Sequence, residues 1–129
     1  MISKRKKRFF RIAKKQAQQS QFPKFRHGAV LVKGGSVISV SENKNQFCSF
    51  ANRFVSHKGH GTIHAELGCV LGLDNAKTKD SVLYVVRLNN DDKLCLSRPC
   101  CMCQSVLKFV GVKKVFYSIS ENEYGCLYL

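Results

Sequence analysis

The chain opens with a segment whose apolar residues recur at the spacing of one helical face. Residues 4–20 are otherwise basic and rich in glutamine, so this pattern predicts an amphipathic helix lying on a core. The apolar positions of this helix are Phe9, Ile12, Ala13 and Ala17. Pro23 falls within residues 21–27 and ends the helical pattern.

Runs of β-branched residues alternate with turn signals through the rest of the chain. Residues 28–32 and 37–40 are joined by Lys33-Gly34-Gly35-Ser36, which predicts a hairpin. Further strands are predicted at 81–88, 112–118 and, more weakly, 124–129, and residues 94–96 are expected to pair back after a turn at 89–92.

Two more helices are predicted between these strands, at 64–73 and 100–110. The first would turn Ala65, Leu67, Val70 and Leu71 inward. Residues 42–62 form a long polar connection that ends beside His64, so we expect it to form part of a pocket rim. The order of elements predicts one layered α/β domain over residues 1–129.

Charge is distributed unevenly along the chain. Its 22 Lys and Arg against 8 Asp and Glu give a net charge of +14, and no acidic residue precedes Glu42. A field of this sign attracts polyanions, so a nucleic acid or a phosphate-bearing nucleotide is the expected partner. The candidate contacts are Lys4, Arg5, Lys6, Lys7 and Arg8. The alternative is a solvated helix face that serves only solubility.

The seven cysteines are odd in number, and no secretory signal precedes them, which favours a reducing, cytoplasmic compartment over a disulfide framework. An apolar content of 44% excludes wholesale disorder, and no apolar run approaches the length of a membrane span. The sequence leaves the oligomeric state open, a homo-oligomer included.

Two short motifs carry the chemistry. His64-Ala65-Glu66 and Pro99-Cys100-Cys101-Met102-Cys103 together read H-x-E…P-C-x-x-C, which is typical of zinc-dependent nucleobase deaminases. One imidazole and two thiolates, from His64, Cys100 and Cys103, would give Zn²⁺ three protein ligands and leave a fourth position for water. Pro99 suits the entry of a helix, and Glu66 would carry protons.

A structural zinc site is the competing interpretation, because such a site needs four protein ligands. The sequence offers further donors at Cys48, His57, His60, Cys69, Cys95 and Cys126, and Cys101 could replace Cys100. The order of the two motifs and the proline before Cys100 favour the catalytic interpretation.

With these residues in view, the chain resembles the cytidine deaminase-like superfamily, and within it the tRNA adenosine deaminase and deoxycytidylate deaminase branches. The resemblance extends to the hairpin 28–38 followed by Asn43, the strand 83–85, and residues 111–117. It departs in an insertion at 88–96 and in Arg98, where the tRNA enzymes often carry glutamate.

The resemblance implies a three-layer α/β/α sandwich with a mixed sheet of about five strands, and hydrolytic loss of ammonia. It implies that His64, Cys100 and Cys103 bind zinc and that Glu66 moves protons. Asn43 would position the sugar, although a turn residue at a strand end explains it nearly as well. The backbone of Ala65 and Cys100, with Pro99 beside them, would contact the base.

The sequence thus predicts a zinc-dependent deaminase that converts cytosine to uracil, with single-stranded DNA or RNA as the favoured substrate. Three alternatives stay open: a deaminase of free cytidine or deoxycytidylate, an adenosine deaminase acting on tRNA, and a non-catalytic nucleic-acid binder with structural zinc. The carboxylate of Glu66 argues against the last.

Overall fold

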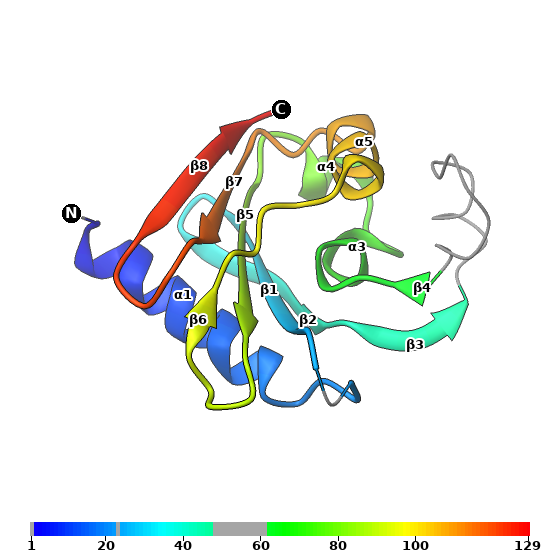
Figure 1. Ribbon diagram of the computed structural model, residues 1–129. Coiled ribbons are helices and arrows are strands. Elements are labelled where there is room, and N and C mark those ends of the chain that lie inside the picture. Colours follow the sequence, from blue (N-terminus) through cyan, green and yellow to red (C-terminus); the bar gives the residue numbers. More distant parts are fainter. Residues whose placement is uncertain (1, 23, 48–61) are drawn as a thin grey trace.

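The computed structural model describes residues 2–22, 24–47 and 62–129. A mixed β-sheet forms the middle layer, with helix α1 on one side and helices α3, α4 and α5 towards the other (Figure 1). This arrangement confirms the predicted three-layer α/β/α class.

The main sheet has six strands in the order β2-β1-β5-β7-β8, with β6 paired to β5. Its strands are β1 (Arg26–Lys33), β2 (Ser36–Glu42), β5 (Val82–Leu88), β6 (Leu94–Cys95), β7 (Lys114–Ser118) and β8 (Tyr124–Tyr128). Only β5 and β7 run parallel to each other, and the other pairs are antiparallel. The predicted hairpin is confirmed, and its turn uses Gly34 and Gly35 at positive φ, a conformation that glycine adopts without strain.

Strands β1, β5 and β7 are buried on both faces, so alternate residues enter two separate cores. Ala29, Leu31, Leu83 and Val85 pack towards α3 and α5. Their neighbours Val30, Val32, Tyr84 and Val86 pack towards α1. Burial on both faces explains why these strands read as continuous apolar runs rather than as alternating ones.

Helix α1 (Lys4–Ala17) covers one face of the sheet and ends three residues before the predicted limit. Ser3 caps it, its Oγ accepting a hydrogen bond from the Lys6 amide at 3.2 Å. The predicted apolar positions all pack on the core, with Ile12 half-buried, but the prediction omitted Phe10, which is buried. The sheet accepts a wider apolar face than a single i, i+3, i+4 row, so Phe10 packs on Tyr84 and Tyr124.

Gly28 lets α1 lie directly on β1. A Cβ at this position would stand 2.1 Å from the carbonyl oxygen of Ala13 and 2.4 Å from the amide nitrogen of Ala17. Both atoms belong to the helix backbone, which cannot move aside as a flexible side chain could. The close approach therefore depends on the missing side chain.

Helices α3 (Ala65–Val70) and α5 (Cys101–Phe109) cover the opposite face. The first ends three residues before the predicted limit, and a short helix that the sequence pattern did not predict, α4 (Asn75–Thr78), follows it. The expected connection 42–62 contains strands β3 (Lys44–Phe47) and β4 (Thr62–Ile63), which pair with each other. Residues 48–61 of that connection lie outside the described residues.

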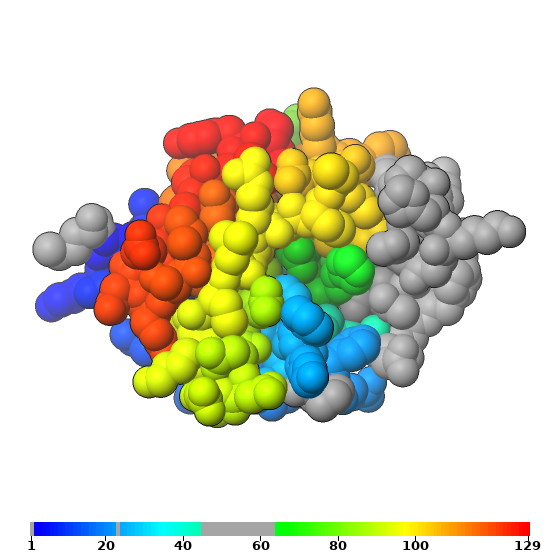
Figure 2. Space-filling view, in the orientation of Figure 1, coloured from blue at the N-terminus to red at the C-terminus, as the bar shows by residue number. Residues whose placement is uncertain are grey.

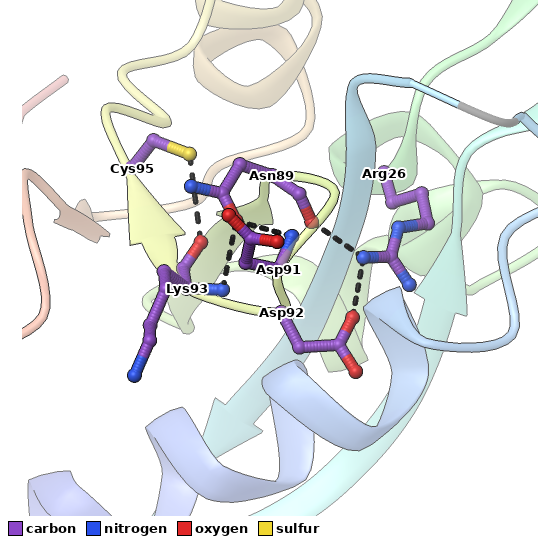
Figure 3. A network of polar contacts seen from close by, with 6 residues as sticks. All are labelled: Arg26, Asn89, Asp91, Asp92, Lys93 and Cys95. Carbon is purple, nitrogen blue, oxygen red and sulfur yellow. Dashed lines mark hydrogen bonds and ion pairs between the residues drawn. The ribbon is translucent and has the colours of Figure 1, made fainter.

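A turn between β5 and β6 is bonded to Arg26 at the start of β1 (Figure 3). The side-chain oxygen of Asn89 accepts hydrogen bonds from the amides of Asp91 and Lys93 at 2.9 and 3.0 Å, which closes the turn predicted at 89–92. The Arg26 guanidinium donates to the carbonyl oxygen of Asn89 at 2.6 Å and pairs with Asp92. In the part of the chain that is described, no helix is long and apolar enough to cross a bilayer.

Candidate metal and catalytic site

The three predicted zinc ligands come from the beginnings of two helices on the same face of the sheet. His64 is the N-cap residue of α3, Cys100 is the N-cap residue of α5, and Cys103 lies one turn further along α5. The spacing of three residues places both thiols on one side of the helix. Segments that are far apart in the sequence thereby meet beside the sheet (Figure 1).

The donor atoms stand at distances that suit a metal ion. His64 Nδ1 lies 3.3 Å from Cys103 Sγ and 3.8 Å from Cys100 Sγ, and all three atoms lie within 4.8 Å of one another. A tetrahedral zinc with bonds of about 2.3 Å to sulfur and about 2.0 Å to nitrogen spaces its ligand atoms about 3.5–3.8 Å apart. The donor set is therefore positioned to bind zinc.

The protonation of the three groups is coupled. The Cys103 thiol donates to Cys100 and lowers the pKa of Cys100 to about 3. The same hydrogen bond, together with burial, raises the pKa of Cys103 well above its ordinary value. The hydrogen bond to Cys100 also raises the pKa of His64. The metal-free site thus combines a thiolate, a thiol and a basic imidazole, so zinc has to displace protons when it binds.

Glu66 lies two residues after His64. It lies in the first turn of α3, only 4% of its surface is exposed, and it lines the same cavity as His64 and Cys100. Its negative charge is one of the causes that raise the pKa of Cys103. Ala65 and Pro99 are buried beside the ligands.

A cavity of about 380 Å³ opens beside these residues. Its lining residues are Phe22, Lys24, Phe25, His27, Asn43, His64, Glu66, Arg98 and Cys100. The start of β1 (blue), α3 (green) and the segment that leads into α5 (yellow) meet on one face of the molecule (Figure 2). The cavity combines aromatic side chains, two exposed cations and one buried carboxylate.

Asn43 lines this cavity, and it also holds the cavity wall together. Its side-chain oxygen accepts from Ser20 Oγ at 2.6 Å and from the His27 amide at 3.0 Å. Its side-chain nitrogen donates to the carbonyl oxygen of Phe25 at 2.9 Å. Phe25 has φ +56, an unfavourable value for a residue with a side chain, so these bonds fix a strained wall.

Sequence reasoning missed a buried serine pair that positions the segment before Cys100. Ser97 Oγ accepts a hydrogen bond from the Ser118 amide at 2.8 Å and donates to the carbonyl oxygen of Val85 at 2.9 Å. Ser118 Oγ donates in turn to the carbonyl oxygen of Cys95 at 2.7 Å. Both serines are at most 3% exposed. Only the proximity of Ser97 to the cysteine motif hinted at this role.

Several other candidates lie away from the site. Arg5 lies against Gly35, at the far end of β1 from the cavity residue His27. Cys69 is buried in the core, and burial raises its pKa to about 12. Cys48, His57 and His60 lie outside the described residues. Among the described residues, the three side chains at 64, 100 and 103 are the group that could hold a metal.

Comparison with known proteins identifies the family. Residues 3–119 match the model of the cytidine and deoxycytidylate deaminase zinc-binding region. Because the match covers most of the chain, the chain belongs to this family of zinc-binding deaminases, hydrolases that break a C–N bond. No curated protein sequence is a significant match.

Solved structures confirm the fold. The dCMP deaminase of the cyanophage S-TIM5 in its apo form superposes with a TM-score of 0.63 at 22% identity, over 92% of this chain and 86% of that one. The same enzyme in complex with dCMP and dUMP gives a TM-score of 0.59 at 21% identity, over 91% and 82% of the two chains. RibD of Acinetobacter baumannii gives 0.59 at 20% identity, over 90% of this chain but only 28% of RibD.

Proposed function

We propose that this protein catalyses the zinc-dependent hydrolytic deamination of cytosine to uracil. The observation that carries the proposal is the placement of Glu66, a buried carboxylate in the same cavity as a His-Cys-Cys metal group. A structural zinc site has no use for that carboxylate, whereas hydrolytic deamination requires a group that moves protons.

The roles of the side chains follow from their positions. His64, Cys100 and Cys103 would hold the zinc, which when bound lowers the pKa of water. Glu66 would accept a proton from the attacking water and return protons to the ring nitrogen and to the departing amine. A C–O bond forms, a C–N bond breaks, and ammonia leaves. The backbone of Ala65 and Cys100, beside Pro99, would contact the base.

The other lining residues suit a base attached to a sugar and a phosphate. Phe22 and Phe25 offer apolar and stacking surface, and Asn43 retains one side-chain N–H for a sugar hydroxyl after its bond to Phe25. Lys24 and Arg98 are exposed cations at the same cavity and would contact phosphate. Cytosine is favoured over the adenine of a tRNA substrate by the family description.

The first candidate substrate is cytosine in single-stranded DNA or RNA, because α1 carries a long acid-free basic surface. The second is a free cytidine or deoxycytidine nucleotide. It is favoured by the distance of about 20 Å along β1 between His27 and the end where Arg5 lies. A mononucleotide in the cavity would meet Lys24 and Arg98 but none of the cations near Gly35.

Mass spectrometry of product tests the activity and the substrate class together. The zinc-loaded protein is incubated with cytidine, deoxycytidine, their monophosphates, and single-stranded DNA and RNA oligomers. Replacing Lys24 and Arg98 with glutamine should raise KM for any phosphorylated substrate and leave nucleosides nearly unchanged, since a nucleoside offers them no phosphate. Absence of deaminated product from every cytosine substrate would refute the proposal.

Glu66→Gln tests the assigned role directly. The variant should keep its zinc and its fold but lose activity by at least about 10²-fold, the usual contribution of a positioned acid–base group. Zinc content and circular dichroism provide the controls. Normal turnover by a zinc-loaded Glu66→Gln protein would contradict the mechanism.

A further inference from the structure

A second cavity lies on the α1 side of the sheet, away from the metal group. It measures about 340 Å³ and is formed by the start of α1, the end of β1 with its turn, and strands β5 and β7. Its charged lining residues are Arg5, Lys6, Lys33, Lys114 and Asp80. Four cations against one carboxylate leave a formal surplus of three positive charges. We call this group of residues the basic cavity.

Two of the cations lie over the same aromatic ring, that of Phe116. The Lys6 ammonium lies 4.6 Å from the centroid of the Phe116 ring, and the Lys114 ammonium lies 5.3 Å from the same centroid. Phe116 is itself 9% exposed, so the ring forms a fixed support beneath them. The ring attracts each ammonium, but the two ammoniums repel each other.

The other two cations are Arg5 of α1 and Lys33 of β1, and each contacts a different part of the backbone. The Arg5 guanidinium crosses the β1–β2 turn so closely that a Cβ at Gly35 would stand 1.8 Å from Nη2. The Lys33 ammonium donates to the carbonyl oxygen of Ala76. Helix α1 therefore contributes two cations to one hollow, and the end of β1 and the start of β7 contribute one each.

Protein carboxylates do not neutralise this group. Within the described ranges the ion pairs are Arg26–Asp92 and Lys44–Glu42, and neither involves the basic cavity. Asp80 lines the hollow without an ion pair to any of the four cations. A concave cluster of like charges focuses the positive potential and concentrates anions from solution.

We propose that the basic cavity binds a chain of phosphate groups, at a site separate from the deaminase cavity. An arginine fork and three lysines on different walls suit several phosphates better than a single carboxylate. The chain of phosphates is either the backbone of a nucleic acid or the tail of a small polyphosphate. Because Lys6 and Lys114 cover the face of Phe116, the cavity recognises phosphate rather than a stacked base.

Binding to two probes tests the proposal. Inorganic tripolyphosphate is titrated by calorimetry, and a labelled single-stranded DNA oligomer is titrated by fluorescence anisotropy at several salt concentrations. The cavity variant is Lys6→Gln with Lys114→Gln. The matched control is Lys108→Gln with Lys113→Gln, which removes the same charge from exposed positions outside the cavity.

Wild type should bind at least one probe, and the cavity variant should weaken that binding by about tenfold or more while the control changes it little. For the oligomer, two lost contacts should reduce the slope of log K against log salt by about 1.4. Loss of tripolyphosphate binding alone identifies a small polyphosphate, and loss of oligomer binding identifies a backbone.

Equal losses in the cavity and control variants, or no binding by wild type, would overturn the proposal. Arg5→Gln provides a second variant if the double substitution unfolds, because Arg5 does not pack on Phe116. Deamination of a nucleoside, measured in parallel, should be the same in all variants. That readout separates a failure of this site from a failure of the proposed activity.

Discussion

Replacing Ser97 with alanine should weaken both the fold and the metal site, although Ser97 touches neither metal nor substrate. The change removes the acceptor of the Ser118 amide and the donor to the carbonyl oxygen of Val85, all in a region that is at most 3% exposed. Each of the two buried groups left unsatisfied costs about 1–3 kcal/mol, so we expect a loss of roughly 2–6 kcal/mol in the free energy of unfolding.

Thermal unfolding of the metal-free protein measures this loss. For a chain of 129 residues, it corresponds to a fall of roughly 7–22 °C in Tm. Zinc affinity, measured by competition with a chelator, should fall as well, since Ser97 anchors the segment that carries Cys100. Ser105→Ala is the control, because its exposed hydroxyl bonds only to the carbonyl oxygen of Cys101 within α5. If both variants melted at the same temperature, the positioning role of Ser97 would be disproved.

Three further predictions follow from geometry already described. Cys103→Ala should reduce the zinc content from about one per chain towards none. Cys101→Ala should retain the zinc, because Cys101 is exposed and lies outside the donor group. Metal analysis of both variants checks this. Gly28→Ala should lower the free energy of unfolding by about 3 kcal/mol or more, because the added methyl group meets backbone atoms of α1. Denaturant unfolding measures this change, and an unchanged stability would exclude the tight helix contact. The pKa of His64 is raised, so protonation of His64 stabilises the metal-free fold at low pH. This stabilisation is lost as pH rises through the raised pKa. Zinc affinity should therefore fall on acidification at a higher pH than an ordinary histidine would give, and a chelator titration across the acid to neutral range checks it.

The sequence predicted the elements whose signal is local. The hairpin turn at Gly34 and Gly35, the strand 82–88 and the entry of α5 after Pro99 each depend on a few adjacent residues, and the structure has them close to the predicted limits. Two of the metal ligands were predictable because the spacing of Cys100 and Cys103 places them on one face of a helix, and His64 was predictable from the H-x-E motif that accompanies the cysteines. His64, Cys100 and Cys103 indeed lie together.

What the sequence could not predict depends on contacts between distant segments. Phe10 is buried because β5 and β8 supply Tyr84 and Tyr124, and no helical period reveals that surface. Ser97 and Ser118 are ordinary polar residues in the sequence, and they become partners only because the segment after β6 lies beside the end of β7. The basic N-terminal residues were treated as one group, whereas the fold directs Arg5 and Lys6 into a separate cavity with Lys33 and Lys114.

The metal group also has a consequence for how firmly the chain is tied together. His64 and Cys100 are 36 positions apart, and each begins a different helix. A bound ion that joins them acts as a cross-link, closing a loop that in the chain-entropy description of cross-links is worth roughly 4 kcal/mol against unfolding. In a domain of this size such a cross-link is a large fraction of the free energy of unfolding. The ion required for chemistry would therefore also supply much of the stability of the folded chain.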